Sequence, residues 1–272
     1  MLTHPSANLT RARHAAEKLI KRFTVSCPED IALDDIAMAL GVLVVEDHLE
    51  GAEARLLRKG GRGIIRVKAG IPEIGRRRFA IAHDLGHWEL HADLSQWALC
   101  SEDDMLGYTG SPSEIEANAF ASELLMPTGL FRPRCERADP DLELIKALAG
   151  EFHTTVTATA IRFVEECRET CTVVFSENGH VRWWRSRSRE PRMWIEPRQA
   201  LHHESVAWDC LKDRPVPQTM QRVPTEAWFQ EPHRGRTVDL YEQSMRLGRY
   251  PTILTLLWIV EGDEDDEDDS DL

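Results

Sequence analysis

The hydrophobic positions of the first forty residues repeat at helical spacing. Across residues 8–23 the apolar side chains recur every three or four positions, which predicts an amphipathic helix. A second helix is predicted over residues 34–40, with Asp34 and Asp35 in its first turn, where carboxylates interact favourably with the helix dipole. Gly41 follows directly and is the residue type that most often ends a helix.

Short β-branched segments precede two longer helical segments in the next part of the chain. Residues 42–46 and 63–67 predict two strands of a small sheet, which flank a basic, glycine-rich turn at residues 59–63. Residues 72–91 and 114–126 then predict helices, and a proline ends the second one. The segment is therefore expected to combine a small sheet with two substantial helices.

The pattern changes from helix to strand in the last third of the chain. Residues 142–152 and 156–164 predict two short helices joined by a polar turn. The alternation that follows predicts a hairpin around Asn178-Gly179, a dipeptide typical of such turns. The predicted strands cover residues 171–176, 181–185, 237–240 and 251–260.

These elements predict an α+β protein with three parts. Residues 1–170 are expected to form a mostly helical domain with a small sheet, and residues 171–260 a smaller mixed α/β region rich in strand. Residues 261–272 carry nine acidic side chains and no basic one, so they predict a disordered acidic tail. Without those nine charges, the net charge of −13 falls to −4, and the folded part is nearly neutral.

The sequence predicts a cytoplasmic protein. No apolar run approaches the roughly 20 residues that a membrane helix needs, and the N-terminus lacks a signal-peptide pattern. The six cysteines are spread thinly over 272 residues, which favours reduced thiols over a disulfide framework. Cys167 and Cys171 are four positions apart; they could assist a metal, but ordinary thiols are the favoured interpretation.

The candidate chemistry lies in the helix predicted over residues 72–91. His83 and His87 are four positions apart, so both imidazoles share one helical face and can reach the same ion. This spacing alone is weak evidence, because 11 histidines in 272 positions give about 0.4 such pairs by chance. His91 extends the row by another turn and is expected to support the site or to pack in the core.

The sequence around this pair resembles the ImmA/IrrE family of metallo-endopeptidases. The family pattern R-F-x-x-A-H-E-x-G-H, followed by a nearby histidine, corresponds to residues 78–91. A second pattern, E-x-x-A-N-x-F-A-x-x-L-L-M-P, corresponds to residues 114–127. Two separated motifs in the right order make the resemblance specific, and it implies a zincin-like fold for residues 1–170.

The resemblance also implies a metal-ligand set. His83, His87 and Glu114 would hold Zn²⁺ and leave a fourth position open, although Mn²⁺ and Fe²⁺ also suit these ligands. Glu116 is the alternative third ligand, and it points about 200° away from Glu114 around the helix, so only one of them can face the metal. Glu114 is favoured because its spacing from Asn118 fits the family pattern.

Asp84 is the departure from the family pattern, which has glutamate at this position. The resemblance makes this carboxylate the general base that takes a proton from the attacking water. Aspartate is shorter by about 1.5 Å, and misplacements of about 1 Å can cost around 100-fold in rate. The two functional hypotheses are therefore a site-specific peptidase and a metal-stabilised regulatory module that keeps the fold without the activity.

The resemblance implies a protein substrate, such as a helix-turn-helix repressor cleaved in response to stress or to a mobile element. The two helices of residues 142–164 have a helix-turn-helix outline themselves, but the second offers only Arg162 to read base edges. An arginine- and tryptophan-rich run at residues 182–198 is a second candidate for nucleic acid, with a solvated basic strand as the favoured alternative. Direct nucleic-acid binding is thus disfavoured, and the oligomeric state is left open.

Overall fold

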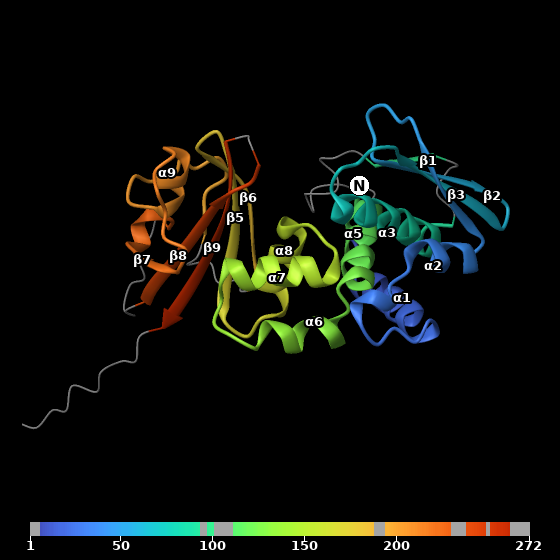
Figure 1. Cartoon of the computed structure of the whole chain (residues 1–272), viewed down its shortest axis with the longest axis horizontal. Helices are drawn as coiled ribbons and strands as arrows, with labels where there is room; N and C mark the ends of the chain where they lie inside the picture. The colour runs from blue at the N-terminus through green and yellow to red at the C-terminus, as the bar shows by residue number, and fades with distance from the viewer. Residues whose placement is uncertain are drawn as a thin grey trace, which may run out of the picture. The chain divides into compact units, whose positions relative to one another are not determined.

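The computed structural model describes residues 6–92, 97–100, 111–187, 194–229, 238–248 and 251–261 (Figure 1). For residues 97–100 and 261 only the backbone is described. Contacts divide the chain into two compact units. Unit 1 comprises Met1–Arg134 and Lys146–Arg162, and unit 2 comprises Cys135–Ile145 and Phe163–Leu272.

The helices and strands follow one another in a mixed order that confirms the α+β class. The elements before the predicted hairpin are α1 Leu9–Arg22, η1 Pro28–Asp30, α2 Leu33–Ala39, β1 Val42–Asp47, β2 Ala54–Lys59, β3 Arg62–Lys68, α3 Ile74–Leu90, β4 Trp97–Cys100, α5 Pro112–Leu125, α6 Thr128–Cys135, α7 Leu142–Phe152 and α8 Val156–Glu166. They are followed by β5 Thr170–Glu177, β6 His180–Ser186, α9 Val206–Leu211, β7 Gln221–Val223, η3 Thr225–Ala227, β8 Val238–Arg246 and β9 Thr252–Glu261.

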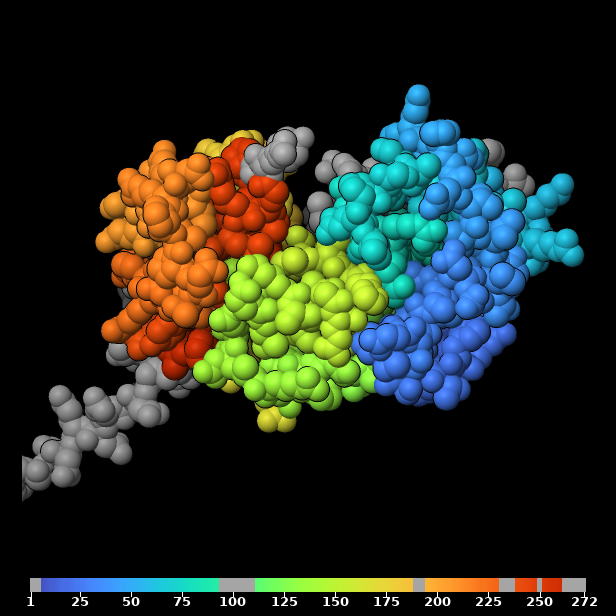
Figure 2. Space-filling model, in the orientation of Figure 1, coloured from blue at the N-terminus to red at the C-terminus, as the bar shows by residue number. Residues whose placement is uncertain are grey.

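Unit 1 packs helices against a four-stranded sheet. The strand order is β1-β3-β2-β4, with β1 parallel to β3 and the other pairs antiparallel. α3 contacts β2 and β3, while α5 contacts both α3 and α1. The core between these elements includes Ile65 and Val67 from the sheet and Ile81, Leu85 and Phe120 from the helices. In Figure 2 the blue N-terminal segment forms one continuous surface with the cyan segment that contains α3.

One connection in this sheet differs from the expectation. The glycine-rich turn at residues 59–63 joins β2 to β3 instead of joining the two strands expected on either side of it. β1 and β3 are parallel neighbours, so a hairpin turn cannot connect them. The intervening β2 was not predicted, because Ala, Arg, Leu and Lys favour helix over strand.

Unit 2 is built around a five-stranded antiparallel sheet with the order β6-β5-β9-β8-β7. The predicted hairpin of β5 and β6 is confirmed, with Asn178 and Gly179 both at positive φ, as a type I′ turn requires. α9 packs against β8 and β9, and Trp228 is the largest side chain of the buried cluster there. The helix was not predicted from its sequence.

The division into units does not follow a single break in the chain. The boundary expected near residue 170 stays a prediction, and the structure adds that Cys135–Ile145 groups with the strand-rich part. The predicted acidic tail lies outside the described residues, except for the backbone of Glu261. Among the described residues, none of the helices combines the length and apolar character needed to cross a membrane.

Candidate metal centre

Two helices of unit 1 supply the candidate site. α3 carries His83 and His87 one turn apart on the same face, in its C-terminal half, and His91 follows as the residue that caps its C-terminus. α5 begins at Pro112, which fits the first turn of a helix, and carries Glu114 and Asn118 one turn apart. The two helices pack directly against each other, so the histidine row of one faces the polar positions of the other.

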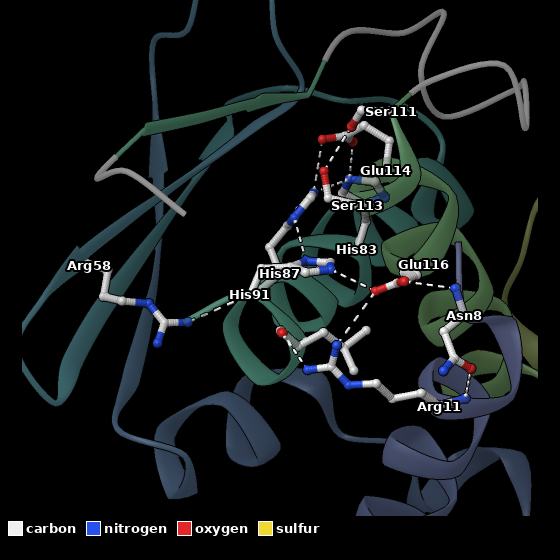
Figure 3. A network of polar contacts seen from close by, with 11 residues as sticks. Asn8, Arg11, Arg58, His83, His87, His91, Ser111, Ser113, Glu114 and Glu116 are labelled. Atoms are coloured by element: carbon white, nitrogen blue, oxygen red, sulfur yellow. Dashed lines mark hydrogen bonds and ion pairs between the residues drawn. The ribbon is translucent and has the colours of Figure 1, made fainter. Parts of the chain in front are cut away.

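The ligand atoms of three side chains converge on one point (Figure 3). The Nε2 atoms of His83 and His87 are 3.0 Å apart. The Glu114 carboxylate places Oε2 3.0 Å from Nε2 of His83 and Oε1 3.2 Å from Nε2 of His87. Both imidazoles are buried, while the side chain of Glu114 is partly exposed.

The close approach of α3 and α5 depends on Gly86. A Cβ at this position would lie 3.1 Å from Cα of Ala117 and 3.1 Å from a ring carbon of Phe120, both on α5. Distances this short are tighter than ordinary van der Waals contact, so a side chain here would push the helices apart. The glycine between the two histidines therefore keeps the carboxylate of Glu114 within reach of both rings.

The donor set fits a divalent cation. Nδ1 of His83 lies 2.8 Å from Oδ1 of Asn118, an acceptor, so that nitrogen carries the proton and Nε2 presents a lone pair. A lone pair that faces a carboxylate at 3.0 Å is repulsive unless a positive charge lies between them. Bonds of about 2.0–2.1 Å in a tetrahedral arrangement put ligand atoms about 3.3 Å apart, close to the observed spacings.

The electrostatics of Glu114 agree with this arrangement. Burial by itself raises the pKa of the Glu114 carboxyl, but positive charge on the side of His83 and His87 outweighs burial and holds that pKa below its ordinary value, as a cation bound at the same point would. The carboxylate is therefore ionised at neutral pH. An anionic oxygen beside two imidazole nitrogens is a ligand set that zinc, manganese and ferrous iron all accept.

Glu116, the alternative third ligand, lies in a different set of contacts. Its Oε2 is 2.9 Å from Nε2 of His91, and its Oε1 accepts a hydrogen bond of 2.7 Å from the backbone N–H of Asn8. Arg11 of α1 approaches the same carboxylate at 4.0 Å. The sequence did not indicate Asn8 or Arg11 as part of the site, because more than one hundred residues separate them from Glu116.

The general base expected from the sequence, Asp84, lies next to His83 in α3 and is fully buried. Its carboxylate is thus held among core side chains and not in bulk solvent. Its part in a reaction stays a prediction.

The other metal and nucleic-acid candidates from residues 167–204 belong to unit 2. His202 and His203, with Glu204, form another group of potential ligands among the described residues, but in unit 2 and largely exposed. Cys167 and Cys171 are free, buried thiols. In the arginine-rich run, Arg189 and Arg192 lie outside the described residues.

Arg162, the one side chain of the second predicted helix that could read a base edge, is fully buried. It pairs with Glu123 of α5 inside unit 1. The side chain therefore stabilises the helices around it and does not project from the surface of α8.

Fold and site together define a mixed α/β domain with a His-His-Glu site of the kind that metallopeptidases use. Residues 37–164 match the Peptidase_M78 family model, described as the IrrE N-terminal-like domain. This confirms the resemblance found in the sequence. No curated protein matches the chain.

The fold is also similar to that of a solved structure, a Mycobacterium tuberculosis transcriptional regulator. The TM-score is 0.59 at 17% sequence identity, and the match covers 92% of this chain and 75% of that one. Because the similarity extends well beyond residues 37–164, it includes elements of both units. At this identity the likeness concerns the fold alone.

Proposed function

We propose that the domain is a zincin-like, metal-dependent endopeptidase. Its cation, for which zinc is the first candidate, is held by His83, His87 and Glu114. The observation that carries this proposal is the convergence of three side chains from two helices, with contacts of 3.0–3.2 Å between the ligand atoms of each pair of side chains. The family match supports peptidase chemistry, and the partly exposed Glu114 supports access for a substrate. Manganese and ferrous iron are the alternative metals.

The side chains divide the chemistry among them. When bound, a divalent cation supplies a Lewis acid that polarises a peptide carbonyl and makes water more acidic. His83 and His87 present Nε2 lone pairs to it, and Asn118 holds the ring of His83 in the required orientation. Asp84 is the proposed base that takes the proton of the attacking water and passes it to the leaving amine.

The proposed substrate is a protein partner, with a DNA-binding repressor of the helix-turn-helix type as the first candidate, cleaved in the cytoplasm during a stress or mobile-element response. The family resemblance motivates this choice, and the fold similarity to a protein described as a transcriptional regulator is compatible with a regulatory context. A short site in one partner, and not general protein degradation, is the expected specificity.

Metal content tests the site directly. Purified protein should contain close to one equivalent of a transition metal by mass spectrometry, and His83→Ala and Glu114→Gln should contain far less. His202→Ala is the matched control, because it removes a histidine from the exposed group in unit 2. Equal metal content in all four proteins would refute the ligand assignment.

Cleavage tests the activity. Incubation of the metal-loaded protein with a repressor encoded beside its gene should give one defined cut, and the cut should be absent in His87→Ala. Asp84→Glu restores the longer side chain of the family pattern and should raise the rate if the aspartate only weakens the enzyme. An intact repressor under all conditions, with Asp84→Glu equally silent, would favour the metal-stabilised regulatory module.

A further inference from the structure

A chain of hydrogen-bonding groups leads from the metal site to the N-terminal helix. Nδ1 of His87 lies 3.2 Å from Nδ1 of His91, and Nε2 of His91 lies 2.9 Å from Oε2 of Glu116. Oε1 of Glu116 accepts the backbone N–H of Asn8 at 2.7 Å. The side chains of His87, His91 and Glu116 are only 3%, 9% and 11% exposed, so solvent has little access to these groups.

The proton positions along this chain follow from its outer end. A carboxylate only accepts hydrogen bonds, and Glu116 already receives one from Asn8. The nitrogen that faces its other oxygen, Nε2 of His91, must therefore carry a proton. A neutral imidazole has one N–H, so Nδ1 of His91 is an acceptor. Nδ1 of His87 then has to be the donor between the two rings.

These proton positions determine which nitrogen of His87 carries the lone pair. With its proton on Nδ1, a neutral His87 has the lone pair on Nε2, the atom that faces Glu114 and His83. The opposite tautomer would put a proton where the cation should bind. His91 itself is not a ligand in this arrangement, because both of its nitrogens are engaged by His87 and Glu116.

We propose that Asn8, Glu116 and His91 act as a positioning relay that holds His87 in the tautomer able to bind the metal. The relay links Asn8, which directly precedes α1, to a site more than seventy residues further along the chain. It rests on the proposed metal function, but the proton positions exist in the metal-free protein as well. The relay can therefore be tested separately from the peptidase activity.

The first test reads the protons directly. In metal-free protein with ¹⁵N-labelled histidines, two-bond ¹H–¹⁵N correlation spectra distinguish protonated from unprotonated ring nitrogens. We expect a protonated Nδ1 in His87 and an unprotonated Nδ1 in His91. Glu116→Gln should disturb both, because an amide that accepts from Asn8 presents its NH₂ group to His91. An unprotonated Nδ1 in wild-type His87 would overturn the proposal.

The second test separates hydrogen bonding from packing at His91. In His91→Gln the amide oxygen can accept from His87 and the amide nitrogen can donate to Glu116, whereas His91→Leu fills the space without either bond. Zinc affinity, measured by competition with a chromophoric chelator, should fall about 10- to 100-fold in His91→Leu. It should stay close to wild type in His91→Gln. Equal affinities in the two variants would show that His91 only packs.

The third test addresses the N-terminal anchor. Asn8→Pro removes the backbone N–H that Glu116 accepts, whereas Asn8→Ala removes only the side chain, which caps α1 by accepting from the N–H of Arg11. We expect weaker zinc binding in Asn8→Pro than in Asn8→Ala. Identical affinities would remove Asn8 from the relay. If no variant and no wild-type protein binds zinc, the metal function fails, while the spectra still decide the relay.

Discussion

Replacing Arg162 with methionine removes the cation of a buried ion pair and should destabilise unit 1 strongly. In the wild-type protein, Nη2 of Arg162 donates to Oε2 of Glu123 at 2.5 Å, to the carbonyl of Met126 at 3.1 Å and to Oγ1 of Thr128 at 2.8 Å. Glu123 also accepts from the backbone and the hydroxyl of Thr128, both at 2.9 Å. The pair thus joins α8 to the end of α5 and the start of α6.

The expected loss follows from the burial of both partners. Arg162 and Glu123 have side chains that are 0% and 3% exposed, so neither charge can be rehydrated when the other is removed. Breaking such a pair costs about 3–5 kcal/mol in the free energy of unfolding. For a unit of 150–250 residues this lowers the melting temperature by about 6–20 °C. Urea unfolding monitored by circular dichroism measures the change.

A matched arginine on the surface provides the control. Arg214 pairs with Asp209 at 2.9 Å, but the side chains are 61% and 41% exposed, so Arg214→Met should cost less than about 1 kcal/mol. The double variant Arg162→Met with Glu123→Leu should recover much of the loss, because apolar replacement of a whole buried pair is often neutral. Equal stability of the two single variants would refute the reasoning.

Three further predictions concern packing, pH and metal. Gly75→Ala should lower the free energy of unfolding by about 1–3 kcal/mol, because the new Cβ would lie 2.5 Å from the backbone of Thr154. Gly150→Ala is the control: its Cβ would meet no neighbouring atom within 4 Å, so the free energy of unfolding should rise by up to about 1 kcal/mol. Thermal unfolding measures both changes. Burial raises the pKa of Glu242 in the folded protein above its ordinary value. The protonated carboxyl therefore contributes stability at pH values below the ordinary pKa, and this contribution is lost as the pH rises through the folded-state pKa. Urea midpoints of Glu242→Gln relative to wild type should therefore rise with pH, and a constant difference would contradict this. Free zinc at 100 times its Kd should stabilise the wild type by about 2.7 kcal/mol in calorimetry, with the gain reversed by a chelator and absent in His87→Ala.

The sequence could predict the parts of the site that depend on local geometry. A spacing of four residues places two histidines on one face of a helix, and α3 shows this arrangement for His83 and His87. The same geometry indicated that Glu114 and Glu116 point in different directions. Helical periodicity could not decide which of them meets the histidines, because the answer depends on how α5 lies against α3.

Strand β2 shows where local preference fails. The segment is basic and rich in helix formers, yet it lies between β3 and β4 and is held there by backbone pairing on both sides. Arg58 adds a tertiary contact, because its guanidinium lies 3.9 Å from the ring centroid of Trp88 and donates to the carbonyl of the same residue at the end of α3. The neighbouring elements therefore outweigh the preference of the segment itself.

Arg162 shows the same limit for function. In the sequence it is the one candidate for base contact in a helix with the position of a recognition helix, and a basic side chain is usually exposed. Its actual partner, Glu123, belongs to the helix that also carries Glu114. The arginine thus supports the element that supplies a candidate metal ligand, and the resemblance of α7 and α8 to a helix-turn-helix is one of outline only.

The site as a whole depends on more of the chain than its two motifs contain. The motifs supply the candidate ligands, Asn118 and Gly86, which sets the separation of the ligand helices. Asn8 lies outside both motifs and binds Glu116 from the start of α1. A short peptide with the same histidine spacing would have the two imidazoles but neither the packing of α5 at Gly86 nor the contact with Asn8. Because metal affinity depends on ligands that are oriented before binding, we expect the start of α1 to affect metal affinity at the candidate site, although it contributes no ligand.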